Sequence, residues 1–274
     1  MINLKNKKVL ITGATGGIGN CLVQKFNDFG SQIIATGTNQ EKLDNLQKKF
    51  NNIYVEKFKL DEHDKIENFI EKVSQKLNGL DVLINNAGIT LDNLSIRLTE
   101  ENWKKVLDVN LTSTFLMCKF AIKKMLKIKK GKIINITSIA GHIGTPYRSV
   151  YSAGKSSLDI ISETLNMEVK DFNINVVSIA PGDYLTDISS RRYHSALVKG
   201  SPYEKKYSSS LKKMNKNVSK GANPIKIAKL VFKIVNTKNP KKSYISGSAL
   251  EKFGIILKFI LPQRFFEYLV LKLF

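Results

Sequence analysis

Six short apolar runs alternate along the chain with longer stretches of helical periodicity, and this alternation constrains the possible folds most. The runs occupy residues 8–12, 32–36, 53–59, 81–85, 132–137 and 174–180. Between them, apolar residues recur at helical spacing over about 17–29, 40–50, 63–77, 100–127 and 150–171. Strands that are apolar along most of their length are typical of a parallel sheet with helices on both faces. The pattern therefore predicts a doubly wound α/β fold, whose ligands bind beyond the carboxyl ends of the strands.

The length of the chain predicts one domain of this kind. Its 274 residues, 42% of them hydrophobic, suffice for one large core, and no repeat or low-complexity linker divides them. We expect a single Rossmann-like domain over residues 1–250, followed by a hydrophobic and basic tail at 251–274. Residues 183–222 are polar, basic and weakly periodic, which is typical of a lid over a site. After this lid, Asn223 is expected to cap a helix that opens with Pro224.

The charge of the chain is strongly positive. It has 44 Lys and Arg against 23 Asp and Glu, a formal net charge of +21. Such a charge attracts nucleic acid, anionic lipid, an acidic carrier protein or a phosphorylated cofactor. The lysines are spread along the whole chain, and the densest run, at 123–132, falls where cations complement the dipole of a helix end. We expect a mostly solvated basic surface and no nucleic-acid partner.

Few features point to a secreted protein or to a metal site. The first residues contain no apolar stretch followed by a small-residue cleavage site. Cys21 and Cys118 lie in helical patterns and suit a reducing compartment. His63, His142 and His194 are not spaced as metal ligands. The sequence therefore predicts a cytoplasmic protein without a metal.

A glycine-rich turn, TGATGGIG, follows the first apolar run and precedes a helix. Glycines let the backbone approach a pyrophosphate, and the start of a helix offers unpaired N–H groups and the positive end of its dipole. The position between strand and helix favours a dinucleotide site over a merely tight turn. The residues expected to bind the cofactor here are Gly13, Thr15, Gly16, Gly17, Ile18 and Gly19.

Tyr151 stands four residues before Lys155 in a predicted helix, with only small residues between them. Side chains four apart share one helix face, with Cβ atoms roughly 5–6 Å apart. A free tyrosine has a pKa of about 10, and a fixed ammonium beside it favours the phenolate. The pair is either an ordinary surface contact or an acid that is tuned to exchange protons near neutral pH.

Several motifs together resemble the short-chain dehydrogenase/reductase family. The glycine-rich turn, NNAG at 85–88, the Tyr–Lys pair, APG at 180–182 and Thr186 occur in the family's order, over about residues 5–187. The resemblance implies hydride transfer between a nicotinamide and a carbonyl carbon. It also implies roles for four residues, in which Tyr151 exchanges the proton, Lys155 tunes it and binds the nicotinamide ribose, Ser138 orients the carbonyl, and Asn110 relays protons through a water.

The cofactor is expected to be NADP(H), with NAD(H) not excluded. NAD-using relatives usually place an acidic side chain after the second strand, where this chain has Gly37. Thr38 and Asn39 can instead hydrogen-bond a 2′-phosphate. By resemblance, Leu60 and Asp61 are expected to contact adenine. Asn86, Ala87 and Gly88 are expected at the adjoining ribose, and Pro181, Gly182 and Thr186 at the nicotinamide end.

Two substrate classes follow from the resemblance. Residues 80–182 are similar to 3-oxoacyl-acyl-carrier-protein reductases, but the likeness fails past residue 187, and Phe172 replaces an arginine with which those enzymes dock the carrier. Lys129 can serve at the other docking position. The tail is similar to that of reductases acting on lipid-like ketones. We place a hydrophobic ketone or its secondary alcohol first, 3-oxoacyl reduction in fatty-acid synthesis second, and a dinucleotide-binding or membrane-docking module without turnover third.

The tail also bears on partners and location. Its aromatic and aliphatic residues alternate with Lys258, Arg264 and Lys272, and Pro262 interrupts it. A bilayer span needs about 20 mostly apolar residues, so we expect none. Residues 252–274 either lie on an anionic membrane surface as a broken amphipathic helix, or pack against the domain or a partner subunit. Relatives are commonly homo-dimers or homo-tetramers through their two long helices, and we expect the same here.

Overall fold

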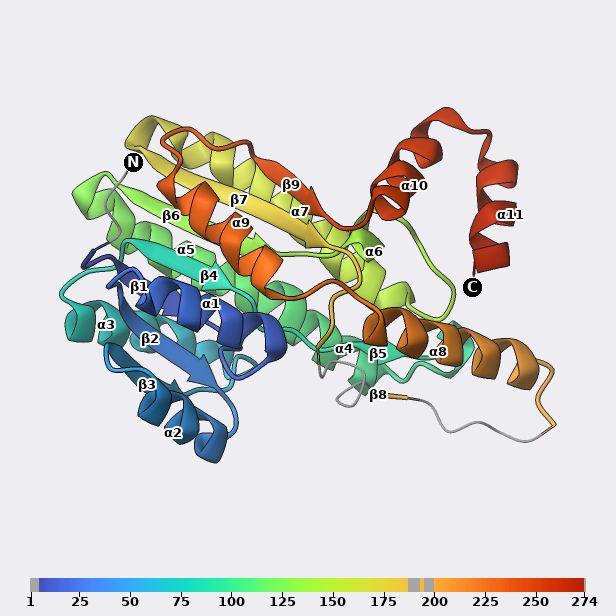
Figure 1. The fold of residues 1–274 in the computed structure, drawn as a ribbon, viewed down its shortest axis with the longest axis horizontal. Coiled ribbons are helices and arrows are strands. Elements are labelled where there is room, and N and C mark those ends of the chain that lie inside the picture. Colours follow the sequence, from blue (N-terminus) through green and yellow to red (C-terminus); the bar gives the residue numbers. More distant parts are fainter. Residues whose placement is uncertain (1–4, 187–192, 195–199, 274) are drawn as a thin grey trace.

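The computed structural model describes residues 5–186, 193–194 and 200–273, and its centre is one parallel sheet (Figure 1). Seven strands lie in the order β3-β2-β1-β4-β6-β7-β9, and every pairing is parallel. Six of them match the predicted runs, and β9 adds an edge. Their bounds are β1 (Lys8–Ile11), β2 (Gln32–Gly37), β3 (Ile53–Lys57), β4 (Val82–Asn85), β6 (Gly131–Ile136), β7 (Ile174–Pro181) and β9 (Ser243–Ser246).

Helices cover both faces of the sheet, which confirms the predicted doubly wound fold. One buried cluster joins the sheet to α1 (Gly17–Asn27), α2 (Gln40–Lys49) and α9 (Ile225–Asn236), through residues such as Phe26 and Val231. A second joins its other face to α3 (Ile66–Leu77), α5 (Ser113–Ile128) and α7 (Ser149–Val169), through residues such as Ile70 and Met117. Single 3₁₀ turns lie at His63–Lys65, Ser95–Arg97 and Lys170–Phe172. The strand order reverses between β1 and β4, which is where ligands bind in such sheets.

α9 starts one residue later than predicted, with Pro224 and not Asn223 at the N-cap position. The helix begins at Ile225, one residue after Pro224. The Asn223 side chain accepts a hydrogen bond from the Ile225 N–H at 2.9 Å. A side-chain oxygen therefore satisfies one of the donors that a helix start leaves unpaired.

The predicted helix over 100–127 is divided, and the prediction of one continuous helix is wrong. α4 (Glu100–Leu107) and α5 are separated by a π-helical turn at Asp108–Thr112. Inside this turn, the Asn110 side chain pairs with the backbone of Ile89 instead of facing solvent. Such π-turns interrupt helices mostly at functional sites, and hydrophobic periodicity does not register them because the helix axis continues.

The segment predicted as an unstructured lid contains a helix, α8 (Glu204–Ser219). Its buried residues recur at helical spacing: Tyr207, Ser210, Met214 and Val218. The many lysines between them mask this pattern in the sequence. The Tyr207 hydroxyl donates to the Asp92 carbonyl at 2.6 Å. Asp92 belongs to β5 (Leu91–Asp92), which pairs with β8 (Tyr193–His194). Two parts of the predicted lid, 187–192 and 195–199, lie outside the described residues. Closure of the lid over the site stays a prediction.

The tail forms two helices, α10 (Ala249–Ile260) and α11 (Gln263–Leu273), which bend at Leu261 and Pro262. Figure 1 shows both in red: α10 lies near the short helix α6 (Ile139–His142) and the end of β9, and α11 lies beyond the bend. Among the described residues, no helix is both long and apolar enough to cross a bilayer. The break at the proline agrees with the prediction of an interrupted helix.

Candidate active site

The glycine-rich turn joins β1 to α1 as predicted, and its shape depends on the absence of side chains. Gly13 has a φ of +62°, a left-handed conformation that favours glycine. A Cβ atom at Gly13 would lie 2.8 Å from the Cα of Ala87. Two stretches of backbone therefore meet closely here, and α1 opens at Gly17 with its first N–H groups beside the space they enclose.

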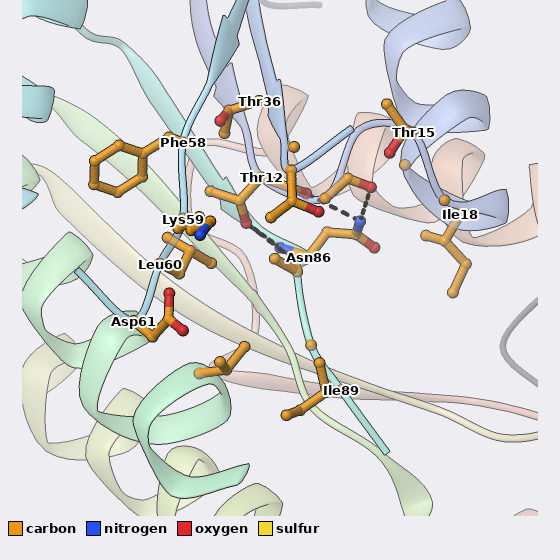
Figure 2. A pocket seen from close by; sticks show the side chains of 18 of the residues that line it. Thr12, Thr15, Ile18, Thr36, Phe58, Lys59, Leu60, Asp61, Asn86 and Ile89 are labelled. Atoms are coloured by element: carbon orange, nitrogen blue, oxygen red, sulfur yellow. Dashed lines mark hydrogen bonds between the residues drawn. The ribbon is translucent and has the colours of Figure 1, made fainter. Parts of the chain in front are cut away.

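A cavity of about 640 Å³ lies beyond the carboxyl ends of β1 to β4 (Figure 2). Thirteen of the residues predicted to bind the cofactor line it: Gly13, Thr15, Gly16, Gly17, Ile18, Gly19, Thr38, Leu60, Asp61, Asn86, Ala87, Gly88 and Thr186. The glycine-rich turn and Thr186, which are far apart in the sequence, meet here, because a Cβ at Gly17 would lie 2.7 Å from the Cγ2 of Thr186. The space suits an extended dinucleotide between glycine backbone and a few polar side chains.

Five other predicted residues lie outside this lining. The Asn39 side chain caps α2 by accepting from the Lys42 N–H at 2.9 Å. Pro181 ends β7, and Gly182 follows it against the tail helix α10. Tyr151 and Lys155 are treated below.

The lining also includes residues that sequence reasoning missed: Thr12, Thr36, Phe58, Lys59, Ile89, Thr90, Lys105 and Val109. Of these, Thr12 gave a readable signal, because a hydroxyl stands between the first strand and the first glycine. Its Oγ1 accepts from the backbone N–H groups of Asn86 and Ala87, both at 3.0 Å. The Asn86 amide in turn donates to the carbonyls of Thr12 at 3.0 Å and Gly13 at 3.1 Å, as the dashed lines in Figure 2 show.

Lys155 is buried in the first turns of α7, with 4% of its surface exposed. Its Nζ donates to the Ile136 carbonyl at 2.9 Å and lies 6.0 Å from the centre of the Tyr151 ring. Burial lowers the pKa of Lys155 to about 8, and the nearby Asp159 carboxylate opposes this shift. Lys155 therefore occupies an interior position and Tyr151 is half-buried, so the solvated surface contact that was the alternative is wrong for Lys155.

Ser138 directly follows Thr137 at the end of β6 and caps the short helix α6. Its Oγ accepts from the Ala140 N–H at 3.1 Å, so this bond uses an oxygen lone pair and not the hydroxyl proton. Two residues earlier, the Ile136 carbonyl holds Lys155. One strand end thus positions both Ser138 and the lysine.

Asn110 is fully buried in the π-turn. Its Oδ1 accepts from the Ile89 N–H at 2.9 Å, and its Nδ2 donates to the Ile89 carbonyl at 2.8 Å. A Cβ at Gly88 would lie 3.1 Å from the Asn110 Oδ1 and 3.6 Å from the Lys155 Nζ. The side chain therefore holds the segment that follows β4 beside the lysine, and its predicted part in a proton relay stays a prediction.

The buried lysine predicts a stability that depends on pH. Between about pH 8 and 10.5, the native Lys155 is neutral while the unfolded one still carries a proton. The unfolded state then binds more protons, so the free energy of unfolding rises with pH across this window, by up to about 1.4 kcal/mol per pH unit for one group. Urea unfolding at several pH values should show this rise for the wild type and a smaller one for Lys155→Met. Parallel curves for the two proteins would contradict it.

Comparisons with known proteins show which proteins this chain resembles in sequence. A family model for short chain dehydrogenase matches residues 7–196. The 3-oxoacyl-(acyl-carrier-protein) reductase FabG of Rickettsia conorii is 40% identical over 192 residues, which cover 70% of this chain and 78% of that protein. FabG of Aquifex aeolicus is 36% identical over 194 residues, with coverage of 69% and 78%.

Solved structures share the fold over a longer part of the chain. The closed form of serine dehydrogenase complexed with NADP+ is 25% identical, with a TM-score of 0.77, and the match covers 88% of this chain and 95% of that one. A short-chain dehydrogenase from Streptomyces avermitilis, 24% identical, has a TM-score of 0.81 with 90% of both chains covered. The sequence match to FabG is thus confined to about two thirds of the chain, whereas the fold extends further.

Proposed function

Because this chain belongs to the short-chain dehydrogenase family and is an oxidoreductase acting on CH–OH or C=O with NAD(P), we propose that it reduces a 3-oxoacyl thioester with NADPH. The observation that carries the catalytic part is the buried Lys155 ammonium beside Tyr151, next to a cavity that is lined by the glycine-rich turn. Membership of the family argues against the non-catalytic module that the sequence left open.

The lining residues fit a phosphorylated dinucleotide. The N-terminus of α1 and the backbone of the glycine-rich turn would hold the pyrophosphate. At the end of β2, Gly37 brings no carboxylate, and its missing Cβ leaves Thr15 close by, 3.2 Å from where that atom would stand. Thr38 and the Lys59 ammonium line the same cavity and would bind a 2′-phosphate. These contacts support NADP(H) over NAD(H).

Each catalytic side chain has a distinct part in the proposed reaction. The bound nicotinamide supplies the hydride. The Tyr151 hydroxyl gives its proton to the carbonyl oxygen of the substrate, and the adjacent Lys155 ammonium favours the phenolate that remains. The Ser138 hydroxyl donates a hydrogen bond to the same oxygen as negative charge develops there. Asn110 keeps the backbone at Ile89 in place beside the lysine.

The relatives favour the 3-oxoacyl substrate, which the sequence analysis placed second. FabG proteins from several bacteria are 34–40% identical over about the same 70% of this chain. A bulkier hydrophobic ketone is the second candidate, and one observation favours it. The family match ends at residue 196, and beyond it this chain has the lysine-rich helix α8 and the apolar helices α10 and α11. Carrier docking is weakened by Phe172, which is 41% exposed where those enzymes carry a cation.

The first experiment measures initial rates of NADPH oxidation with a short 3-oxoacyl thioester and, in parallel, with a long-chain and a steroidal ketone. We expect turnover of the thioester and a preference for NADPH over NADH of about tenfold or more, as the loss of a charged hydrogen bond implies. Turnover of the bulky ketones alone would replace the first candidate by the second. Equal rates with both dinucleotides would remove the NADP(H) preference.

Assembly and location belong to the same proposal. We infer a homo-dimer or homo-tetramer through α4, α5 and α7, as relatives form, and a cytoplasmic enzyme that contacts a membrane only at its surface. Exposed apolar side chains on these helices, among them Phe115 and Ile160, support an interface there. Sedimentation velocity measures the size of the assembly directly.

A further inference from the structure

The tail helix α10 carries two faces of opposite character. One face lies on the domain and includes Glu251, the buried Ile255, and Lys258. The other face is apolar and open to solvent at Leu250, Phe253, Ile256 and Ile260, which are 52–71% exposed. A helix at the surface of a soluble protein normally turns its apolar face inward. α10 does the reverse, so this face lacks the cover that its composition calls for.

The second tail helix carries further exposed apolar side chains and cations. Phe265, Tyr268 and Leu271 of α11 are each more than half exposed. The Lys272 Nζ lies 4.7 Å above the Tyr268 ring, and Arg264 is exposed beside Phe265. With Phe259, the most exposed of all at 80%, the two helices gather eight large apolar side chains within 22 positions, Leu250 to Leu271. Gathered exposed apolar side chains of this kind mark interaction sites.

We propose that this surface, α10 and α11 together, docks on an anionic lipid bilayer. The helices are too short to cross it, and the bend at Pro262 lets both lie in the plane of the headgroups. Lys252, Arg264 and Lys272 flank the apolar side chains and would pair with anionic headgroups. A second copy that met this surface with its own tail is a poorer occupant, because it would bring the same cations, Lys252, Arg264 and Lys272, against the first set.

The docked helices would also be tied to the active site. The Glu251 Oε1 accepts from the Asp183 N–H at 2.8 Å, just after Pro181 and Gly182. Further along α10, the Lys258 Nζ donates to the His142 carbonyl at 2.5 Å. His142 ends α6, the helix that Ser138 caps. A bilayer under α10 thus lies next to the predicted substrate end of the site and could deliver an apolar substrate from the lipid. This delivery rests on the proposed function.

Co-sedimentation with vesicles tests the docking without substrate or cofactor. The full chain is mixed with vesicles of phosphatidylcholine alone and of phosphatidylcholine with phosphatidylglycerol. We expect binding to the anionic vesicles that weakens with salt, and a loss of about tenfold in Ile256→Glu/Phe259→Glu, which places like charge against the lipid. Tyr54→Glu on β3, at a side chain 44% exposed on the opposite edge of the sheet from β9, is the matched control and should bind as the wild type does.

Three results would overturn the proposal. They are equal binding to both kinds of vesicle, unchanged binding of the double variant, and a change from a larger to a smaller assembly in the double variant, which would identify a second copy as the occupant. Turnover of a short, water-soluble 3-oxoacyl thioester is measured on the same proteins. That substrate needs no bilayer. If the wild type does not turn it over, the result counts against the proposed function and not against docking.

Discussion

Tyr151→Phe is expected to lower kcat by roughly 10²–10⁴-fold, the range that general acid catalysis contributes, while the affinity for NADPH stays close to that of the wild type. The substitution removes the hydroxyl proton and keeps the ring that lies 6.0 Å from the Lys155 Nζ. The glycine-rich turn and the other lining residues are untouched. Steady-state turnover assays measure kcat, and NADPH fluorescence titration of the same preparation measures the affinity for the dinucleotide.

Tyr147→Phe is the matched control for this change. Tyr147 lies four positions earlier, outside α7, and its ring meets that of Tyr207 edge to face at 5.0 Å. Phenylalanine keeps this ring contact, so both kcat and NADPH affinity should stay near the wild-type values. Wild-type turnover by Tyr151→Phe would refute the proposed proton donor and would point to another acid in the site.

Gly19→Ala is expected to destabilise the fold and to remove NADPH binding together. A Cβ at Gly19 would lie 2.1 Å from the Gly13 carbonyl oxygen and 2.8 Å from the Cα of Ala14. Both neighbours are backbone atoms of the glycine-rich turn, so relief of the clash requires α1 to move away from the turn. Forced contacts of this kind cost about 1–3 kcal/mol or more. Urea unfolding and fluorescence titration measure the two losses.

Gly144→Ala is the corresponding control, because a Cβ there would meet no atom within 4 Å. Its free energy of unfolding and its NADPH affinity should match those of the wild type. If Gly19→Ala bound NADPH as tightly as Gly144→Ala does, the close approach of α1 to the turn would have no part in holding the cofactor.

The sheet was predictable from the sequence because its strands are buried on both faces. β1 is apolar over Val9–Ile11 and β4 over Val82–Ile84, and such short apolar runs between helical stretches are typical of a parallel sheet that is covered on both faces. α8 was missed for the opposite reason. Tyr207, Met214 and Val218 bury one narrow stripe, and the lysines that cover its other faces dominate the composition.

The site was predictable where backbone geometry dictates the residue type. Gly13 is needed at its φ of +62°, and the spacing of Tyr151 and Lys155 follows from the helix. The part of Asn110 was harder to foresee, because a π-turn and the backbone of Ile89 define it. Lys59 and Lys105 enter the cavity from segments whose course only the folded chain determines. Spacing along one element is therefore readable, whereas convergence of separate elements is not.

The hydrogen bond between Glu251 and Asp183 has a consequence for how the protein is made. Synthesis proceeds from the N-terminus, so α10 is translated after every strand of the sheet. The Asp183 amide, next to the predicted nicotinamide end, receives its carboxylate partner only when α10 has left the ribosome. The backbone between β7 and α8 therefore has this carboxylate contact only once nearly the whole chain has been made.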